Sequence, residues 1–337
     1  MHSMKLRAVL LPFLCLPLLA AAAEPEVSIG NGPIQAKVYL PDAKDGFYKG
    51  GRFDWSGIIH SLTYKGHDYF GPWFQERRAD VKDFVYEGDK VVTGPASSIM
   101  GPAEEYSPLG YDDAAAGGVF VKLGIGVLRK SEAKPYDHYL SYAMVDPGKW
   151  TVTHDKDWVE FKHELNAPNG YGYVYTKRVQ LVAGKPQMTL QHSLRNTGKQ
   201  TIKSAGYDHN FLTLDQKPAG PGYTITTPFD LKTPRPLQGD LASVTGKQIV
   251  YQKKLQGEDR VTTPFTGYSA NASDYDFRIE SKEAGAGMRV TGDKPLSRAM
   301  MWSIRTVVSV EPYIDVTVEP GKTMDWKYTY DFYTLAK

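Results

Sequence analysis

Cysteine is nearly absent from this sequence of 337 residues, which contains only Cys15. A disulfide within one chain is therefore excluded, and the protein must be stabilised by its core, which a chain of this length can supply. An excess of charge of one sign is also lacking, because 40 basic residues face 38 acidic ones, and no basic block is interleaved with aromatic residues. We therefore expect no nucleic-acid partner.

Long apolar runs are scarce as well. Residues 8–19 form a mainly apolar segment that follows Lys5 and Arg7 and is itself followed by four alanines. This order is typical of a secretory signal peptide, and no later stretch approaches the roughly 20 apolar residues that a membrane-spanning helix needs. We predict that residues 1–23 are a signal peptide, that residues 24–337 form a periplasmic or secreted protein, and that the membrane is not a partner.

Few segments have helical periodicity, whereas apolar and polar residues alternate in 158–165 and 185–194. Such alternation is typical of antiparallel strands with one solvated face. The 32 glycines and 22 prolines are spread along the whole chain, as expected for strands joined by turns. We expect strands over residues 27–29, 34–40, 58–64, 119–128, 136–145, 150–154, 158–165, 171–181, 188–196, 201–214, 314–318 and 324–333.

The segment 71–118 is less regular and is predicted to form long surface loops that could frame a cleft. Because no linker separates the strands, we predict one all-β domain over residues 24–337. Its architecture would be a large antiparallel β-supersandwich with few or no long helices.

Motifs for metal and phosphate chemistry are also missing. The histidines have no ligand-type spacing with cysteines or acids, and there is neither a Gly-x-Ser-x-Gly elbow nor a phosphate-binding loop. We therefore expect no metal site and no cofactor.

The chain is rich in aromatic residues, 22 of them tyrosines. They suit pleated sheets and also suit surfaces on which sugars stack, and composition does not choose between these uses. Within them, the segment 206–215 places His209 in a run suited to a buried strand. His209 is either a core histidine that is hydrogen-bonded to a carbonyl group or part of a functional site.

Several segments, in their order along the chain, resemble the galactose mutarotase-like, or aldose 1-epimerase, superfamily. The strongest are His209-Asn210-Phe211-Leu212 and, a hundred residues later, the strand segment 307–312 with Glu311. The others are the turn Asn196-Thr197-Gly198, the hairpin Glu319-Pro320-Gly321-Lys322, the strand start Tyr171-Gly172-Tyr173 and the opening segment Gly50-Gly51-Arg52 with residues 58–66. The resemblance implies an all-β fold, a carbohydrate partner and the activity of an aldose 1-epimerase.

Interconversion of sugar anomers needs one group to take the proton of the C1 hydroxyl and another to protonate the ring oxygen. The resemblance implies that Glu311 is the base and His209 the acid, a pair that works best when its pKa values are pushed apart. Two alternatives stay open on fold analogy alone: a non-catalytic carbohydrate-binding protein, and a module related to polysaccharide lyases or hydrolases.

Further sugar contacts are expected near the start of the mature chain. Arg52 and Asp54 can bind sugar hydroxyls while Trp55 stacks on the ring, although a turn residue and a surface ion pair are the simpler interpretation of Arg52 and Asp54. His60 and Trp73 are added as candidates because they lie close to this segment in the sequence.

Overall fold

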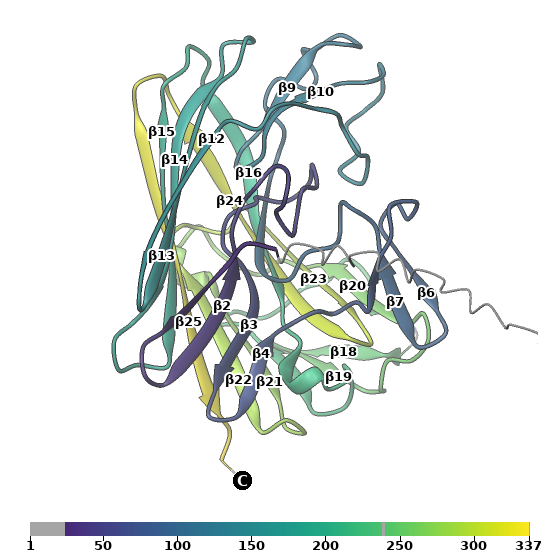
Figure 1. The fold of residues 1–337 in the computed structure, drawn as a ribbon. Coiled ribbons are helices and arrows are strands. Elements are labelled where there is room, and N and C mark those ends of the chain that lie inside the picture. The colour runs from purple at the N-terminus through teal and green to yellow at the C-terminus, as the bar shows by residue number, and fades with distance from the viewer. Residues whose placement is uncertain (1–23, 238–239, 337) are drawn as a thin grey trace, which may run out of the picture.

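The chain folds almost entirely into strands and turns (Figure 1). The computed structural model describes residues 24–237 and 240–336. These residues contain no α-helix, and the short 3₁₀ turns η1 (Leu214–Gln216) and η3 (Ala272–Asp274) lie wholly within them. No helical segment in this part of the chain is long and apolar enough to cross a membrane. The predicted signal peptide, residues 1–23, lies outside the described residues.

Two large sheets dominate the fold. The first has ten antiparallel strands in the order β12 (Lys149–Asp155), β13 (Trp158–Asn166), β14 (Gly172–Leu181), β15 (Gln187–Asn196), β25 (Thr323–Thr334), β22 (Ala286–Gly292), β21 (Asp276–Ser281), β17 (Tyr223–Thr226), β19 (Gln248–Tyr251) and β18 (Ala242–Thr245). The second has five, in the order β20 (Arg260–Pro264), β23 (Arg298–Ile304), β24 (Val307–Val318), β16 (Ile202–Phe211) and β8 (Gly101–Tyr106).

Three smaller sheets lie around them. One is β1 (Glu26–Gly30), β2 (Ile34–Tyr39), β3 (Ile58–Tyr64) and β4 (His67–Phe70). The others are β11 (Met144–Asp146), β10 (Gly126–Arg129) and β9 (Val119–Lys122), and β5 (Glu76–Arg77), β7 (Lys90–Thr93) and β6 (Phe84–Glu87). In Figure 1 the β9–β10 and β6–β7 hairpins lie on the side of the five-stranded sheet that faces away from the ten-stranded sheet.

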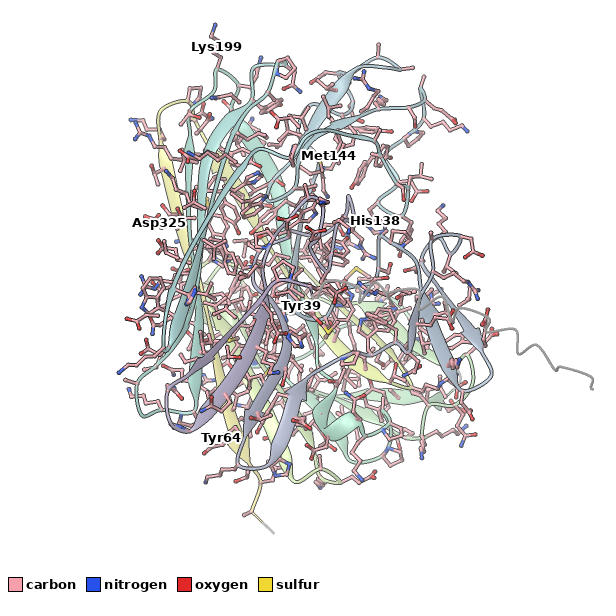
Figure 2. The ribbon with its side chains drawn as sticks, viewed as in Figure 1. Tyr39, Tyr64, His138, Met144, Lys199 and Asp325 are labelled. Atoms are coloured by element: carbon pink, nitrogen blue, oxygen red, sulfur yellow. The ribbon has the colours of Figure 1, made fainter. Side chains whose placement is uncertain are left out.

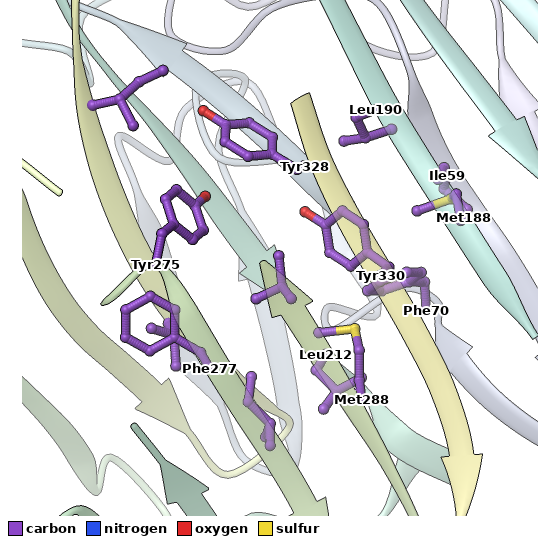
Figure 3. Packing of buried hydrophobic residues seen from close by; sticks show 14 of the residues in the cluster. Ile59, Phe70, Met188, Leu190, Leu212, Tyr275, Phe277, Met288, Tyr328 and Tyr330 are labelled. Atoms are coloured by element: carbon purple, nitrogen blue, oxygen red, sulfur yellow. The ribbon is translucent and has the colours of Figure 1, made fainter. Parts of the chain in front are cut away.

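Aromatic and aliphatic side chains fill the space between the two large sheets (Figure 3). Tyr328 and Tyr330 of β25 alternate with exposed or half-buried residues, as the sequence pattern predicts. They lie beside Leu190 of β15 and Leu212, which follows β16. Complete burial of one such side chain is worth about 1.5–3 kcal/mol, so this layer supplies much of the folding free energy.

The prediction of an all-β antiparallel sandwich is confirmed. Most predicted strands are present, but residues 136–145 are largely irregular, and only Met144–Asp146 is a strand there. The prediction that residues 71–118 are surface loops is wrong in one important part, because β8 is completely buried. Its sequence, with a proline, an alanine and two glutamates, has low strand propensity, and the contacts with β16 override that propensity.

From Gly206 to Phe211 the strand β16 is buried on both faces, which explains why its sequence does not alternate cleanly there. Asp208 points toward the ten-stranded sheet, where the Tyr330 hydroxyl donates a hydrogen bond to it. Tyr207 and Phe211 point the opposite way, into a second apolar cluster that includes Trp73. The five-stranded sheet therefore separates two cores, and the candidate site opens in the second.

Candidate functional site

A cavity of about 360 Å³ lies on the outer face of the five-stranded sheet. Strand residues of this sheet form its floor. The segment 73–97, which includes the β6–β7 hairpin, and the loop residues 138–139 form its walls. His138, labelled in Figure 2, belongs to the loop that follows β10. The lining residues are Arg52, Trp73, Asp83, Phe84, Ser97, His138, Tyr139, Tyr207, His209, Phe211, Arg260, Thr262, Arg298, Met300, Trp302, Glu311 and Tyr313.

His209 and Glu311 face each other across the floor. They belong to the neighbouring strands β16 and β24, and the His209 Nε2 atom lies 3.4 Å from the Glu311 Oε1 atom. The other ring nitrogen, Nδ1, lies 2.7 Å from the hydroxyl of Ser309, two residues before Glu311 on the same strand face. The imidazole is also stacked on Phe211, with ring centroids 3.7 Å apart. Its orientation is therefore fixed on three sides.

Burial shifts the pKa values of this pair. It raises the pKa of Glu311 to about 7, although the positive charge of Arg52 acts in the opposite direction. Burial, together with the charge of Arg52, holds the pKa of His209 well below its ordinary value. Both shifts favour the uncharged forms, a neutral carboxyl group beside a neutral imidazole. The sequence-based expectation was the opposite charge state, an ionised Glu311 and a protonated His209.

A second ionic cluster borders the pair. Arg52 donates to Glu105 from Nε (2.8 Å) and to the Tyr207 hydroxyl from Nη2 (2.9 Å), and that hydroxyl donates to Glu105 (2.6 Å). His138 lies 3.3 Å from the other Glu105 oxygen, and Lys122 lies 3.4 Å from it. Burial alone would raise the pKa of Glu105, but Lys122 and Arg52 hold it well below its usual range. The Arg52 side chain is thus held in place in the cavity wall, and Glu105 compensates its charge.

Aromatic rings make up much of the remaining wall. Trp302 stands edge-on to His209, with centroids 5.4 Å apart, and also packs against Phe84 and Trp73. Tyr313 stacks on Tyr207 at 4.5 Å. Such rings offer apolar faces beside polar groups, the combination that a sugar ring with its C–H face and hydroxyls can use.

The structure brings four of the seven predicted site residues together in this cavity: His209, Glu311, Arg52 and Trp73. Asp54, Trp55 and His60 do not line it.

Asp54 is buried within the fold, where Ser56 donates to it and Lys177 lies 3.5 Å away. Trp55 is also buried, and its indole nitrogen donates to the carbonyl of Gly50. The prediction that Asp54 and Trp55 contact a ligand in this site is therefore corrected, because adjacent residues of this irregular segment point to different surroundings.

His60 lies elsewhere on the molecule. Its Nε2 atom is 2.8 Å from Glu26, and its ring stacks on Tyr39. Closeness to Arg52 in the sequence was the only reason to predict a site role for His60, and the strand β3 carries it away from the cavity.

Sequence reasoning missed several lining residues. Arg298, Met300 and Trp302 lie on one face of β23, but the sequence of this strand does not alternate between apolar and polar residues, so periodicity did not reveal them. Glu105, which holds Arg52 but does not itself line the cavity, gave no such signal, because β8 does not have the composition of a strand. His138 lies in a loop, and only the three-dimensional fold brings it to the site.

Groups of three or more His, Cys, Asp or Glu side chains arranged to hold a metal ion are not found in residues 24–237 and 240–336. The two acids near the centre of the site, Glu311 and Glu105, are engaged by His209 and by cationic side chains instead.

No protein-family model matches the sequence, and no curated protein matches it in sequence. Solved structures do match the fold. A galactose mutarotase related enzyme from Lactobacillus acidophilus has a TM-score of 0.53 at 10% identity, over 93% of this chain and 98% of the other. An aldose epimerase homologue from C. elegans has a TM-score of 0.52 at 14% identity, over 93% and 100%. A galactose mutarotase-like protein from Clostridium acetobutylicum has a TM-score of 0.51 at 11% identity, over 94% and 97%. The chain therefore has the all-β fold of the galactose mutarotase-like proteins.

Proposed function

We propose that this protein is an aldose 1-epimerase-like enzyme, which interconverts the anomers of a sugar by general acid/base catalysis with His209 and Glu311. The observation that carries the proposal is the placement of these two side chains, 3.4 Å apart, on the floor of a cavity of about 360 Å³ with aromatic walls. The C1 hydroxyl and the ring oxygen of an aldose are bonded to one carbon. Two proton-transfer groups this close together can therefore serve both oxygens.

The chemistry needs one acid and one base at the same time. When the pair holds one transferable proton, either Glu311 is the acid and His209 the base, or the proton has moved and the roles are exchanged. The pKa directions favour the first arrangement in the free cavity. Because ring opening and ring closure are the reverse of each other, the group that gives a proton in one step takes it back in the other.

The Ser309 hydroxyl supports this use of the imidazole. It can accept a hydrogen bond from Nδ1–H, which leaves Nε2 as the basic nitrogen that faces Glu311, or donate one when the tautomer changes. A histidine with one nitrogen held and the other directed at a carboxyl group in a cavity is arranged as a proton carrier.

Polarimetry of freshly dissolved single anomers, over a panel of aldoses, tests the proposal. We expect wild-type protein to accelerate mutarotation of at least one sugar, and we expect His209→Ala and Glu311→Gln to reduce that acceleration about 10²- to 10⁴-fold. His67→Ala is a matched control, since His67 is also paired with a carboxylate, Asp215, at 2.8 Å but lies outside the cavity.

Sugar binding without acceleration of mutarotation would refute the proposed enzyme activity and favour the carbohydrate-binding alternative. Cleavage of a polysaccharide with formation of an unsaturated sugar would favour the lyase alternative.

Export is the second part of the proposal. It is supported by the sequence order of the segment 1–23. Mass spectrometry of the protein recovered from a secreting host should give a chain that begins at Glu24. A full-length chain retained in the cytoplasm would contradict this part.

A further inference from the structure

Three arginines line the cavity, and they differ in how their charge is compensated. Arg52 is bonded to Glu105 at 2.8 Å. Within the described part of the chain, Arg260 and Arg298 have no carboxylate oxygen within 4.0 Å. Their guanidinium groups lie instead over aromatic rings of the cavity wall, Phe84 for Arg260 and Tyr313 for Arg298, each 5.1 Å from the ring centroid.

Arg298 lies beside the reacting pair. It begins β23 and is paired with Tyr313 of β24, and two residues later Met300 is paired with Glu311. The guanidinium Nη2 atom is 2.8 Å from the sulfur of Met300, so the side chain extends along the cavity floor toward Glu311. Its charge is close enough to lower the pKa of Glu311 against the effect of burial.

Arg260 has a different position. It is paired with Ile304, at the opposite end of β23 from Arg298. The charge of Arg260 lowers the pKa of the nearby Tyr86 hydroxyl. Glu258 and Asp259, which precede Arg260 in the sequence, raise the pKa of the same hydroxyl. The acid that interacts with Arg298 is Glu311 itself, so an anion held by Arg298 would lie next to the reacting pair.

Arg298 is exposed to solvent in the free protein. A neutral ligand that covered it would remove water from its charge and supply no countercharge, which costs free energy. A guanidinium group presents a planar fork of donors that matches a carboxylate or a phosphate. The aromatic ring beneath it holds the fork in place without occupying its donors.

We propose that the sugar bound in this cavity carries an anionic group, a carboxylate or a phosphate, and that Arg298 binds that group. This inference rests on the proposed function, because it takes the His209–Glu311 cavity as the sugar site. It adds the substrate class, acidic sugars, and a specificity residue that does not take part in the proton transfers.

Matched sugar pairs test the inference. Galactose against galacturonate reports on a carboxylate, and glucose against glucose 6-phosphate reports on a phosphate. We expect one anionic sugar to be favoured over its neutral partner by about 10- to 100-fold in kcat/KM, the range for hydrogen bonds to charged groups. The arm in which this preference appears identifies the anion.

Arg298→Gln should abolish most of that preference. Arg260→Gln should leave a clear preference. Arg77→Gln is the matched control, because Arg77 also stands over an aromatic ring, Phe47, at 4.3 Å but lies outside the cavity and is paired with Glu24. Circular dichroism and melting curves establish that each variant is folded.

Equal kcat/KM for both members of each sugar pair would overturn this inference, although the proposed epimerase activity would still stand. So would an unchanged preference in Arg298→Gln. If no mutarotation is seen, the affinities of the same sugars, measured by calorimetry, distinguish failure of the proposed activity from failure of the proposed anion binding by Arg298. Tighter binding of an anionic sugar that is lost in Arg298→Gln would support the specificity of the site even though the proposed activity had failed.

Discussion

Replacement of Glu311 by glutamine should stabilise the protein above neutral pH, although it removes a proton-transfer group. Burial raises the pKa of Glu311 from its ordinary value of 4.5 to about 7. The folded state therefore holds this proton more tightly than the unfolded state. The stabilisation from protonated Glu311 is complete below about pH 4.5 and is lost as the pH rises through about 7.

The size of the effect follows from the two pKa values. Each pKa unit corresponds to about 1.4 kcal/mol, so keeping Glu311 ionised in the folded protein costs about 3 kcal/mol. Glutamine has nearly the same shape, stays neutral and can donate to His209 Nε2. The variant should therefore gain about 1 kcal/mol over wild type at about pH 5 and about 3 kcal/mol at about pH 8.

Urea unfolding of both proteins at these two pH values measures the difference. Glu105→Gln is the comparison of opposite sign, because it leaves Arg52 and Lys122 buried without their carboxylate and should cost about 3–5 kcal/mol. A Glu311→Gln variant that is less stable than wild type at about pH 8, or whose advantage does not change with pH, would refute the reasoning about burial.

Three other outcomes are expected. The kcat/KM for mutarotation, corrected for the spontaneous reaction, should fall about tenfold per pH unit above about pH 7. At that pH Glu311 ionises and the pair loses its transferable proton. A flat profile up to about pH 9 would contradict this prediction. Ser309→Ala should lower kcat about fivefold with little change in KM, because His209 loses the hydroxyl that orients it, and Ser309→Thr should restore kcat; a change in KM alone would argue against this positioning role. Gly206→Ala should cost about 1–3 kcal/mol in urea unfolding, because its methyl group would lie 2.7 Å from the Tyr106 ring, and unchanged stability would mean that this contact is loose.

Periodicity in the sequence was enough to predict the fold class and many strands. In β13 and β25 one face packs on the core and the other is in contact with solvent, so apolar and polar residues alternate along the sequence. It fails where both faces are covered or where the composition is atypical. β16 lies between two cores, and β8 is held by its pairing with β16 despite a sequence of low strand propensity.

The candidate site was predictable only in part. His209 and Glu311 were found through a family resemblance, and their approach to 3.4 Å depends on the register of β16 with β24, which the sequence does not specify. Their charge state could not be predicted, because it depends on burial. The positions of Asp54 and Trp55 were wrong for a related reason, since side-chain directions in an irregular segment are set by tertiary contacts such as the one with Lys177.

A double-mutant cycle tests most directly whether His209 and Glu311 act as one acid/base pair. The kcat/KM for mutarotation of the preferred sugar is measured for wild type, His209→Ala, Glu311→Gln and the double variant. If the two residues exchange protons as a unit, each single variant should lose nearly all the activity, and the double variant should be no worse than either. Losses that multiply in the double variant, or single variants that keep wild-type rates, would contradict the proposed mechanism.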